Sequence, residues 1–366
     1  MKPVDRVLNC IKRKSIDRVP RNFTAFPEIV ERLKSHFSLE GDQSYGSPLI
    51  KCVDPRLLEA LSCDFRMVAP EYHGPGIIKE SDGSWTNLFG VKRKVVKVKT
   101  GMYYSYEGTP LKNATARDVK NYPWPRPEWF DYSTVEKQCQ RFADFAIVSG
   151  YPGNVDFLNK TATLIGMENL MMGLARKDAA VLEIFDKLAE FFYEYNQRIF
   201  EIGKGKIHIA YFGDDYGSSN NLLISPRMYE EIIYPRFKPF YDLARSYGLM
   251  VMHHSCGSVG KLLPYFIEAG VEILDVVQPY VPFMDFHELK ENFGEKLTFH
   301  GGICVQKILP DATAGEVKKE VDKVISILGK GGGYILCPTN KIGPEVPLEN
   351  VLAMYGFQLR VRTWDA

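Results

Sequence analysis

Residues 249–255, LMVMHHS, form a short apolar run that follows Gly248 and a long helical pattern. That pattern, residues 225–248, repeats apolar side chains at positions i, i+3, i+4 and i+7, which is typical of an amphipathic helix. A second apolar run follows at residues 271–277, VEILDVV. Short apolar runs are typical of buried strands, and their alternation with helices favours a parallel sheet.

The same alternation covers the whole chain. Eight apolar runs are predicted strands, at residues 19–25, 63–70, 145–150, 207–213, 249–255, 271–277, 296–301 and 332–337. Helical patterns lie between them, with predicted starts at Ser225-Pro226 and at Thr313. This order predicts an α/β fold, a single (β/α)8 TIM barrel that spans residues 1–366. An open doubly wound sheet would need a glycine-rich loop after its first strand, and residues 22–29 contain no glycine.

One segment interrupts the alternation of strand and helix. Residues from about Ile77 to Gly108 alternate polar and apolar side chains around turn signals at Asp82-Gly83 and Gly101. We therefore expect an antiparallel β-hairpin, inserted between the second and third strands of the barrel.

Composition excludes several classes of partner. The chain of 366 residues has 46 Lys and Arg against 45 Asp and Glu, and a net charge of +1 gives no electrostatic footprint for nucleic acid or an anionic membrane. The start lacks the apolar core of a signal peptide, and no later stretch is long and apolar enough to span a bilayer. Seven cysteines at irregular spacings fit reduced thiols. We expect a cytoplasmic protein without a nucleic-acid or membrane partner.

Three soft metal ligands stand at the ends of predicted strands. His254 and Cys256 end or follow the fifth apolar run, and Cys337 ends the eighth. Zn²⁺ prefers imidazole and thiolate ligands, and three protein ligands leave a fourth position for water or substrate. A buried cysteine on its own is most often only a small apolar residue. Because a closed barrel would bring all three to one end, the sequence predicts a catalytic zinc site.

Other polar residues also fall near the predicted strand ends, where the active site of a βα barrel lies. We expect catalytic roles for Asp64, His300 and Asp215. The expected substrate-binding residues are Arg66, Tyr151, Asn154, Asp214, Asp275, Gln278 and Asn340. Asp214 or Asp215 is also a candidate fourth metal ligand; the alternative is that they orient His254 or cap a turn. An ion pair with Arg66 or Arg56 is the alternative to catalysis for Asp64.

Several motifs together resemble the uroporphyrinogen decarboxylase superfamily. They are SIDRVP (15–20), SPRMYEEIIYPRFKPFYDLARSYG (225–248), HHSCG (253–257), GVEILDVVQP (270–279), TFHGGI (298–303) and GGYILCPTNKIGPEVPLENV (332–351). The resemblance extends over nearly the whole length and implies a (β/α)8 barrel. Decarboxylases of this family carry an arginine-rich loop after the first strand and an LGHG-type segment near the end. Here these positions read RNFTAFPEI and CPTNKIGP, with Asn340 near the place of the family histidine.

The chain is more similar to the corrinoid-dependent methyltransferase branch of that superfamily. In that branch a His-x-Cys motif and a distant cysteine hold zinc, which corresponds to His254, Cys256 and Cys337. The resemblance implies zinc-dependent transfer of a methyl group between a corrinoid (methylcobalamin), carried by a partner protein, and a small molecule. That small molecule is a thiol, a pterin, or a methoxy or methylamine compound.

Two other functions stay open at this point. Asp64 lies where the decarboxylase aspartate is expected, so a decarboxylase acting on a smaller carboxylated substrate is one alternative. The other is a non-catalytic barrel that binds a corrinoid or tetrapyrrole. The resemblance also makes a homodimer an expectation, because decarboxylases of this family often form dimers.

Overall fold

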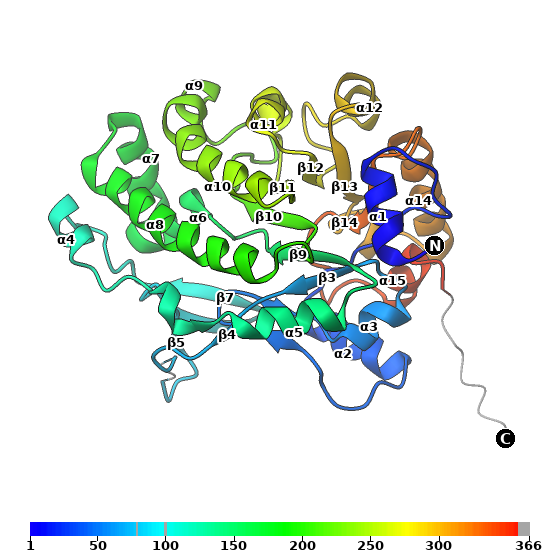
Figure 1. Cartoon of the computed structure of the whole chain (residues 1–366), viewed down its shortest axis with the longest axis horizontal. Helices are drawn as coiled ribbons and strands as arrows, with labels where there is room; N and C mark the ends of the chain where they lie inside the picture. The colour runs from blue at the N-terminus through cyan, green and yellow to red at the C-terminus, as the bar shows by residue number, and fades with distance from the viewer. Residues whose placement is uncertain (78–79, 99–100, 358–366) are drawn as a thin grey trace.

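A curled sheet of seven parallel strands, with helices on its outer side, forms the body of the molecule (Figure 1). The computed structural model describes residues 1–77, 80–98 and 101–357. The spatial order of the strands is β14-β13-β12-β11-β10-β9-β3. Each strand pairs in parallel with the strands beside it in this order. Their bounds are β3 (Phe65–Val68), β9 (Ala146–Gly150), β10 (Ile209–Gly213), β11 (Met250–His254), β12 (Ile273–Val277), β13 (Thr298–Ile303) and β14 (Tyr334–Pro338). The fold is an α/β barrel of the TIM type.

Helices connect the strands and cover the outside of the sheet (Figure 1). The α-helices are α1 (Pro3–Ile11), α2 (Pro27–His36), α3 (Pro55–Ala60), α4 (Ala116–Lys120), α5 (Ser133–Arg141), α6 (Phe157–Ile165), α7 (Met167–Arg176), α8 (Ala179–Ile202), α9 (Pro226–Met228), α10 (Tyr234–Ser246), α11 (Leu263–Ala269), α12 (Phe286–Phe293), α13 (Ile308–Asp311), α14 (Ala314–Leu328) and α15 (Leu348–Met354). Short helical turns of other types are η1 (Pro127–Trp129), η2 (Tyr229–Ile233) and η3 (Gly260–Leu262).

The first predicted strand is not a regular strand in the structure. Residues 19–25 nevertheless lie between β14 and β3 and close the barrel there. The Leu336 amide donates to the Pro20 carbonyl, and the Asn22 amide donates to the Leu336 carbonyl. On the other side, the Asp64 amide donates to the Arg21 carbonyl. The segment therefore has hydrogen bonds to both neighbours. A continuous strand does not form, because Pro20 has no amide hydrogen to donate to a neighbouring strand.

Side-chain alternation along the strands separates two packing surfaces. Inward positions of six strands and residues of α1 form an apolar cluster inside the barrel, with Phe65, Val148, Ile209, Met252, Ile273, Ile335, Val7 and Ile11 among its members. Outward positions pack against the helices in a much larger core. Because α1 contributes to the inner cluster, it fills the amino-terminal end of the barrel. The carboxyl-terminal end is left for polar side chains.

The predicted helix over residues 225–248 divides into three elements. Ser225 caps the first turn, with its hydroxyl accepting from the Met228 amide at 3.1 Å. A π-helical segment, η2, then leads into α10. Pro235, the second residue of α10, lies just after η2 and cannot donate the backbone hydrogen bond that would continue a regular helix, which is the physical reason that one regular α-helix does not form. Thr313 caps α14 in a reciprocal capping box with Glu316, as predicted.

The segment between β3 and β9 forms a separate antiparallel sheet. Its strands are β5 (Trp85–Thr86), β6 (Lys92–Val98) and β7 (Gly101–Glu107), and Lys92 pairs with Glu107 at the open end of the hairpin. Residues 78–79 and 99–100 of the expected insertion lie outside the described residues. Two further strand pairs are β1 (Tyr45–Gly46) with β2 (Lys51–Cys52), and β4 (Glu71–Tyr72) with β8 (Phe130–Asp131).

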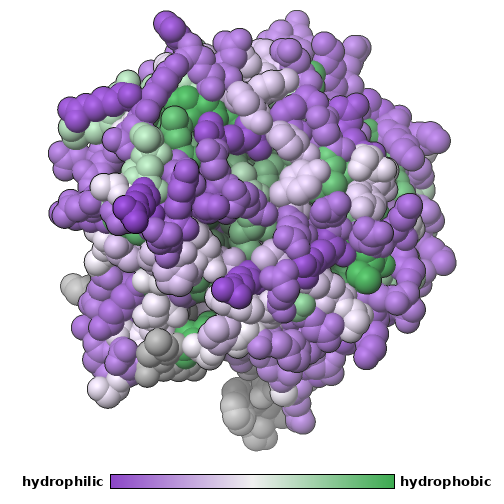
Figure 2. All heavy atoms as spheres, turned by 60° about the vertical axis from the view of Figure 1, so that its left-hand side comes forward, coloured by the Kyte–Doolittle hydropathy of each residue, from purple (hydrophilic) through white to green (hydrophobic). Residues whose placement is uncertain are grey.

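The face drawn in Figure 2 is mostly hydrophilic, and hydrophobic residues show on it as small separate areas. Among the described residues, every helix is too short or too polar to cross a bilayer.

Candidate functional site

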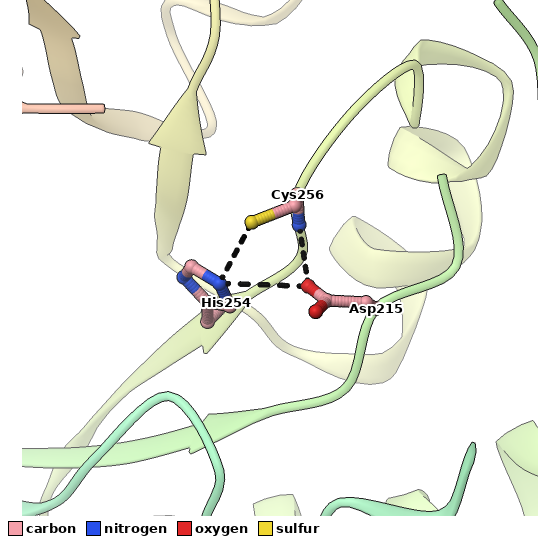
Figure 3. A group of neighbouring side chains, drawn as sticks. All are labelled: Asp215, His254 and Cys256. Atoms are coloured by element: carbon pink, nitrogen blue, oxygen red, sulfur yellow. Dashed lines mark hydrogen bonds and ion pairs between the residues drawn. The ribbon is translucent and has the colours of Figure 1, made fainter. Parts of the chain in front are cut away.

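Three potential metal ligands meet at the carboxyl-terminal ends of β10 and β11 (Figure 3). His254 is the last residue of β11, Cys256 follows two residues later, and Asp215 lies two residues after β10. The Nε2 atom of His254 is 3.3 Å from the Cys256 Sγ and 3.5 Å from the Asp215 Oδ1. One nitrogen, one sulfur and one oxygen ligand atom therefore lie within 4.8 Å of one another. This donor set suits Zn²⁺.

Two glycines allow the loops that carry these ligands to approach closely. A Cβ atom on Gly257 would lie 2.6 Å from the Ser218 carbonyl oxygen, and one on Gly217 would lie 2.6 Å from the Cys256 carbonyl oxygen. Gly257 also has a φ of +79°, which side chains disfavour. The close approach of the two loops places the Cys256 amide 2.8 Å from the Asp215 Oδ1, to which it donates a hydrogen bond.

A buried carboxylate behind the cluster fixes its histidine. Asp275, on β12, binds the His254 Nδ1 through Oδ2 and the His300 Nδ1 through Oδ1, both at 2.5 Å. The Tyr211 hydroxyl also donates to the Asp275 carboxylate. Because Asp275 takes up the Nδ1 side of His254, the Nε2 atom is directed toward Cys256 and Asp215. A carboxylate that orients a metal-binding histidine in this way sets its tautomer and increases its basicity.

The electrostatics of this group favour a cation at the His254 Nε2. Burial opposes the charged imidazolium, but Cys256 and Asp275 outweigh it and raise the pKa of His254 well above its ordinary value. Burial likewise opposes the ionised form of Asp275, yet the His300 and His254 rings hold the pKa of that carboxyl well below its usual range. The same negative groups that retain a proton here would attract a metal ion in its place.

Two cavities approach the three-ligand cluster. The larger has a volume of about 390 Å³, and His254, Asp275, His300, Cys337 and Tyr151 are among the residues that line it. The smaller, of about 230 Å³, reaches Cys256 and is lined mainly by uncharged polar residues that include Gln278 and Ser218. Asn340 lines both cavities. The cluster therefore lies where two separate volumes meet, which is an arrangement suited to two reactants.

Several expected substrate-binding residues line these cavities. Tyr151 and Asn340 do so in the larger one, and Gln278 lines the smaller one while its Oε1 accepts from the Gly257 amide at 3.0 Å. His300 is buried and lines the larger cavity, and its Nε2 lies 3.0 Å from the Asn22 Nδ2. These residues share one end of the barrel, as the strand-end argument predicted.

Cys337 is not part of the three-ligand cluster in the structure. Asp215 takes the third place instead, although Cys337 lies in the wall of the same cavity as His254. The Cys337 thiol is buried, and burial together with Asp275 raises its pKa well above the ordinary value.

Two expected site residues lie at the opposite end of the barrel. Because β3 begins at Phe65, Asp64 precedes the strand and does not end it. Its carboxylate pairs with Arg6 at 2.5 Å and with Arg18 at 2.8 Å, and it is fully buried. Arg66 points outward, with its guanidinium 3.7 Å from the Phe145 ring. The expectation that these two residues line the active site is wrong, since both face away from the cavities.

Two further expected residues hold the structure near the site without facing substrate. Asp214 accepts hydrogen bonds from the Phe157 and Leu158 amides and so caps the start of α6. Its burial, with Asp156 nearby, raises the pKa of Asp214 well above the ordinary value. Asn154 donates to the Asn196 side chain at 2.9 Å and is fully buried. Capping was the alternative that the sequence left open for Asp214.

Sequence reasoning missed Tyr211 and Asn22. Both line the larger cavity, and each contacts one side chain of the Asp275 network. Tyr211 could have been found, because it lies two residues before the end of a predicted strand and so shares the inward face with Gly213. Asn22 carried no comparable signal, since its segment is irregular.

Comparison with known proteins places the chain in a family. The profile of the family described as uroporphyrinogen decarboxylase (URO-D) matches residues 160–357, which is more than half of the chain. The chain belongs to the uroporphyrinogen decarboxylase family. The matched part of this URO-D chain contains β10 to β14 and all three residues of the three-ligand cluster. No curated protein sequence matched the chain.

One solved structure shares the fold of this chain over nearly its whole length. A methyltransferase from Methanosarcina mazei superposes with a TM-score of 0.64 at 19% identity, over 97% of each chain. D-psicose 3-epimerase gives a TM-score of 0.34 at 13% identity, over 67% of this chain and 79% of the other. The 3-keto-D-glucoside 4-epimerase of E. coli gives 0.34 at 11% identity, over 64% and 91%. At this identity the first similarity establishes a shared barrel.

Proposed function

We propose that the protein is a zinc-dependent methyltransferase that moves a methyl group between a corrinoid, carried by a partner protein, and a small thiol. A pterin, methoxy or methylamine compound is the alternative small reactant. The observation that carries the proposal is the group formed by Asp215, His254 and Cys256 at the meeting point of two cavities. The barrel's similarity to the Methanosarcina mazei methyltransferase, and the lack of the decarboxylase arginine-rich loop, support it.

The residues present fit a zinc ion. Asp215, His254 and Cys256 supply three donors of the types that zinc binds, and the two cavities leave room for a further ligand. Bound zinc would supply Lewis acidity that lowers the pKa of a thiol and makes a thiolate available at neutral pH. Asp275 positions the His254 ring for this role through the bond to Nδ1.

Methyl transfer to a thiol needs few groups besides a positioned nucleophile. The thiol loses its proton to solvent, and a sulfur lone pair forms the bond to the methyl carbon. The bond from cobalt to carbon breaks, and its electron pair stays on cobalt. The protein's own contribution is to hold the two reactants in line, and the larger cavity, with His300 and Tyr151 on its walls, supports placement of the small reactant there.

Decarboxylation through Asp64 has no comparable support. The Asp64 carboxylate is fully buried at the amino-terminal end of the barrel and is taken up by Arg6 and Arg18. A catalytic carboxylate needs to reach substrate, and Asp64 lines neither of the two cavities that approach the three-ligand cluster.

The first test measures zinc and methyl transfer together. We expect about one zinc per chain by mass spectrometry of the purified protein, and loss of that zinc in Cys256→Ser. We also expect transfer from free methylcobalamin to 2-mercaptoethanol, followed by the absorbance of the cobalamin, to disappear in the same variant. Cys139→Ser, a buried cysteine on α5, is the matched control and should keep both. Tight binding of methylcobalamin without turnover would favour a non-catalytic barrel.

A further inference from the structure

Two large aromatic side chains are displayed on the loop that joins β12 to α12. Tyr280 is 55% exposed and Phe283 is 52% exposed. Both have left-handed backbone conformations, with φ values of +65° and +63°. Bulky side chains rarely adopt this conformation, and exposed rings gain little packing energy to compensate for it. A strained backbone that shows two rings to solvent is better explained by a partner than by folding.

Neighbouring residues fix this loop in place. The Ser258 hydroxyl donates to the Pro282 carbonyl at 2.7 Å. Gly260 packs so closely that a Cβ atom there would lie 2.1 Å from the Phe283 carbonyl oxygen. The rings are therefore held outward by a preformed backbone, which lowers the entropy that binding would cost.

A lysine accompanies each ring. The Lys307 Nζ lies 4.8 Å from the centre of the Tyr280 ring, and the Lys261 Nζ lies 4.3 Å from the centre of the Phe283 ring. Within the described part of the chain, neither ammonium group has a carboxylate within 4.0 Å. We name these four residues the aromatic rim. Its two rings and two unpaired cations complement a protein surface that carries carboxylates around an apolar centre.

The aromatic rim borders the smaller cavity that leads to Cys256. Gln306, next to Lys307, and Gln278, two residues before Tyr280, both line that cavity. On the other side, the Lys261 Nζ lies 3.5 Å from the Asn221 Oδ1, and Asn221 belongs to the same tight turn as Ser218. A macromolecule seated on the rim would therefore cover the opening nearest to the cluster sulfur.

We propose that the aromatic rim is the docking surface for the protein that carries the corrinoid, and that this partner presents an acidic surface to it. This inference rests on the proposed function and adds the place from which the larger reactant approaches. The small reactant then uses the larger cavity, so the two substrates enter on different sides of the cluster.

The test compares free and protein-bound methylcorrinoid with the double variant Tyr280→Gly, Phe283→Gly. Glycine accepts both φ values, so the variant removes the rings without backbone strain. The protein-bound probe is the corrinoid protein of the source organism, purified by its cobalamin absorption, reduced to the Co(I) state with titanium(III) citrate and then methylated with methyl iodide. We expect its KM to rise by about tenfold or more, while the KM for free methylcobalamin and the zinc content stay unchanged. Tyr193→Ser, which removes an exposed ring on α8, is the control and should alter neither.

Charge supplies a second, independent measurement. Lys261→Glu with Lys307→Glu should slow transfer from the protein-bound probe and remove its dependence on salt concentration. An unchanged KM for the protein-bound probe in both double variants would overturn the inference. So would a lower thermal stability of the glycine variant, or loss of self-association in it, since either would assign the rings to folding or to a second copy of this chain. No transfer from free methylcobalamin by the unaltered protein would instead reject the proposed function.

Discussion

The two ends of the barrel each contain a buried aspartate, and their surroundings differ in kind. Asp64, at the amino-terminal end, is saturated by the guanidinium groups of Arg6 and Arg18. Asp275, at the carboxyl-terminal end, is bound by two imidazoles and a phenol. Arginine stays charged at all relevant pH values, whereas an imidazole can exchange its proton for a metal. The side chains that contact a buried carboxylate, more than its burial, therefore distinguish a structural aspartate from one that supports a functional site.

Removal of the Asp64 charge should have the largest effect on stability. Asp64→Asn leaves Arg6 and Arg18 next to an uncharged group in a buried setting, and we expect the free energy of unfolding to fall by about 3–5 kcal/mol. Asp17→Asn is the control, because Asp17 pairs with the same Arg6 at a position that is 42% exposed and should matter little. Denaturant unfolding measures both. If the folded fraction of Asp64→Asn binds zinc with unchanged affinity, Asp64 contributes to stability and not to the zinc site.

The identity of the third ligand is the next largest effect. Asp215→Asn replaces the charged carboxylate of the cluster by a neutral amide. We expect zinc affinity to fall by more than about 100-fold, which exceeds the loss expected for a residue that only orients a ligand. Cys337→Ser should lower it less, because that sulfur is outside the cluster. Competition with a chromophoric chelator measures both affinities. The reverse order would restore the ligand set expected from the sequence.

Asp275→Asn should weaken the site by an intermediate amount. Asparagine keeps the shape but cannot accept from both the His254 and His300 Nδ1 atoms as a carboxylate does. We expect zinc affinity about 10–100-fold lower, measured by the same chelator competition. Asp242→Asn, a surface change on α10, is the control. Equal zinc binding in Asp275→Asn and the unaltered protein would show that Asp275 acts as a structural carboxylate like Asp64.

The smallest effect is a pH dependence confined to the metal site. In the metal-free protein the folded-state pKa of His254 is raised, so its contribution to stability is complete below the unfolded value of about 6.5. That contribution is lost as the pH rises through the folded pKa. Zinc binding should change in the opposite direction and strengthen with rising pH, because protons compete for the same Nε2. Unfolding curves with and without zinc measure this contrast, and His254→Gln should abolish it.

The strand and helix order was predictable because apolar periodicity reports which faces are buried. The same alternation led us to expect His254, Asp275 and His300 near the strand ends, and in the structure all three line the larger cavity. The position of Asp64 was misjudged, although the apolar run at residues 63–70 already placed it near the start of the predicted strand. In the structure Asp64 directly precedes β3 (Phe65–Val68), so it lies at the amino-terminal end of the barrel, away from the active end.

The choice of ligands was less accessible. His254 and Cys256 stand two residues apart in an extended segment, so their proximity is local. Asp215 joins them because Gly217 and Gly257 let two loops touch, and such a contact leaves no pattern in the spacing of residues. The capping role of Asp214 was an open alternative for the same reason, since neighbouring aspartates in one loop can face different ways.

The irregular segment that closes the barrel, residues 19–25, contacts side chains at both ends of the barrel. The Arg21 amide donates to the Asp64 carboxylate at 2.8 Å, and the side chain of the next residue, Asn22, reaches His300 at 3.0 Å. Two adjacent residues, Arg21 and Asn22, thus contact opposite ends of the barrel. A ligand that fixes Asn22 in the cavity should slow hydrogen exchange of the Arg21 amide at the far end, so this seam would act as a built-in reporter of occupancy.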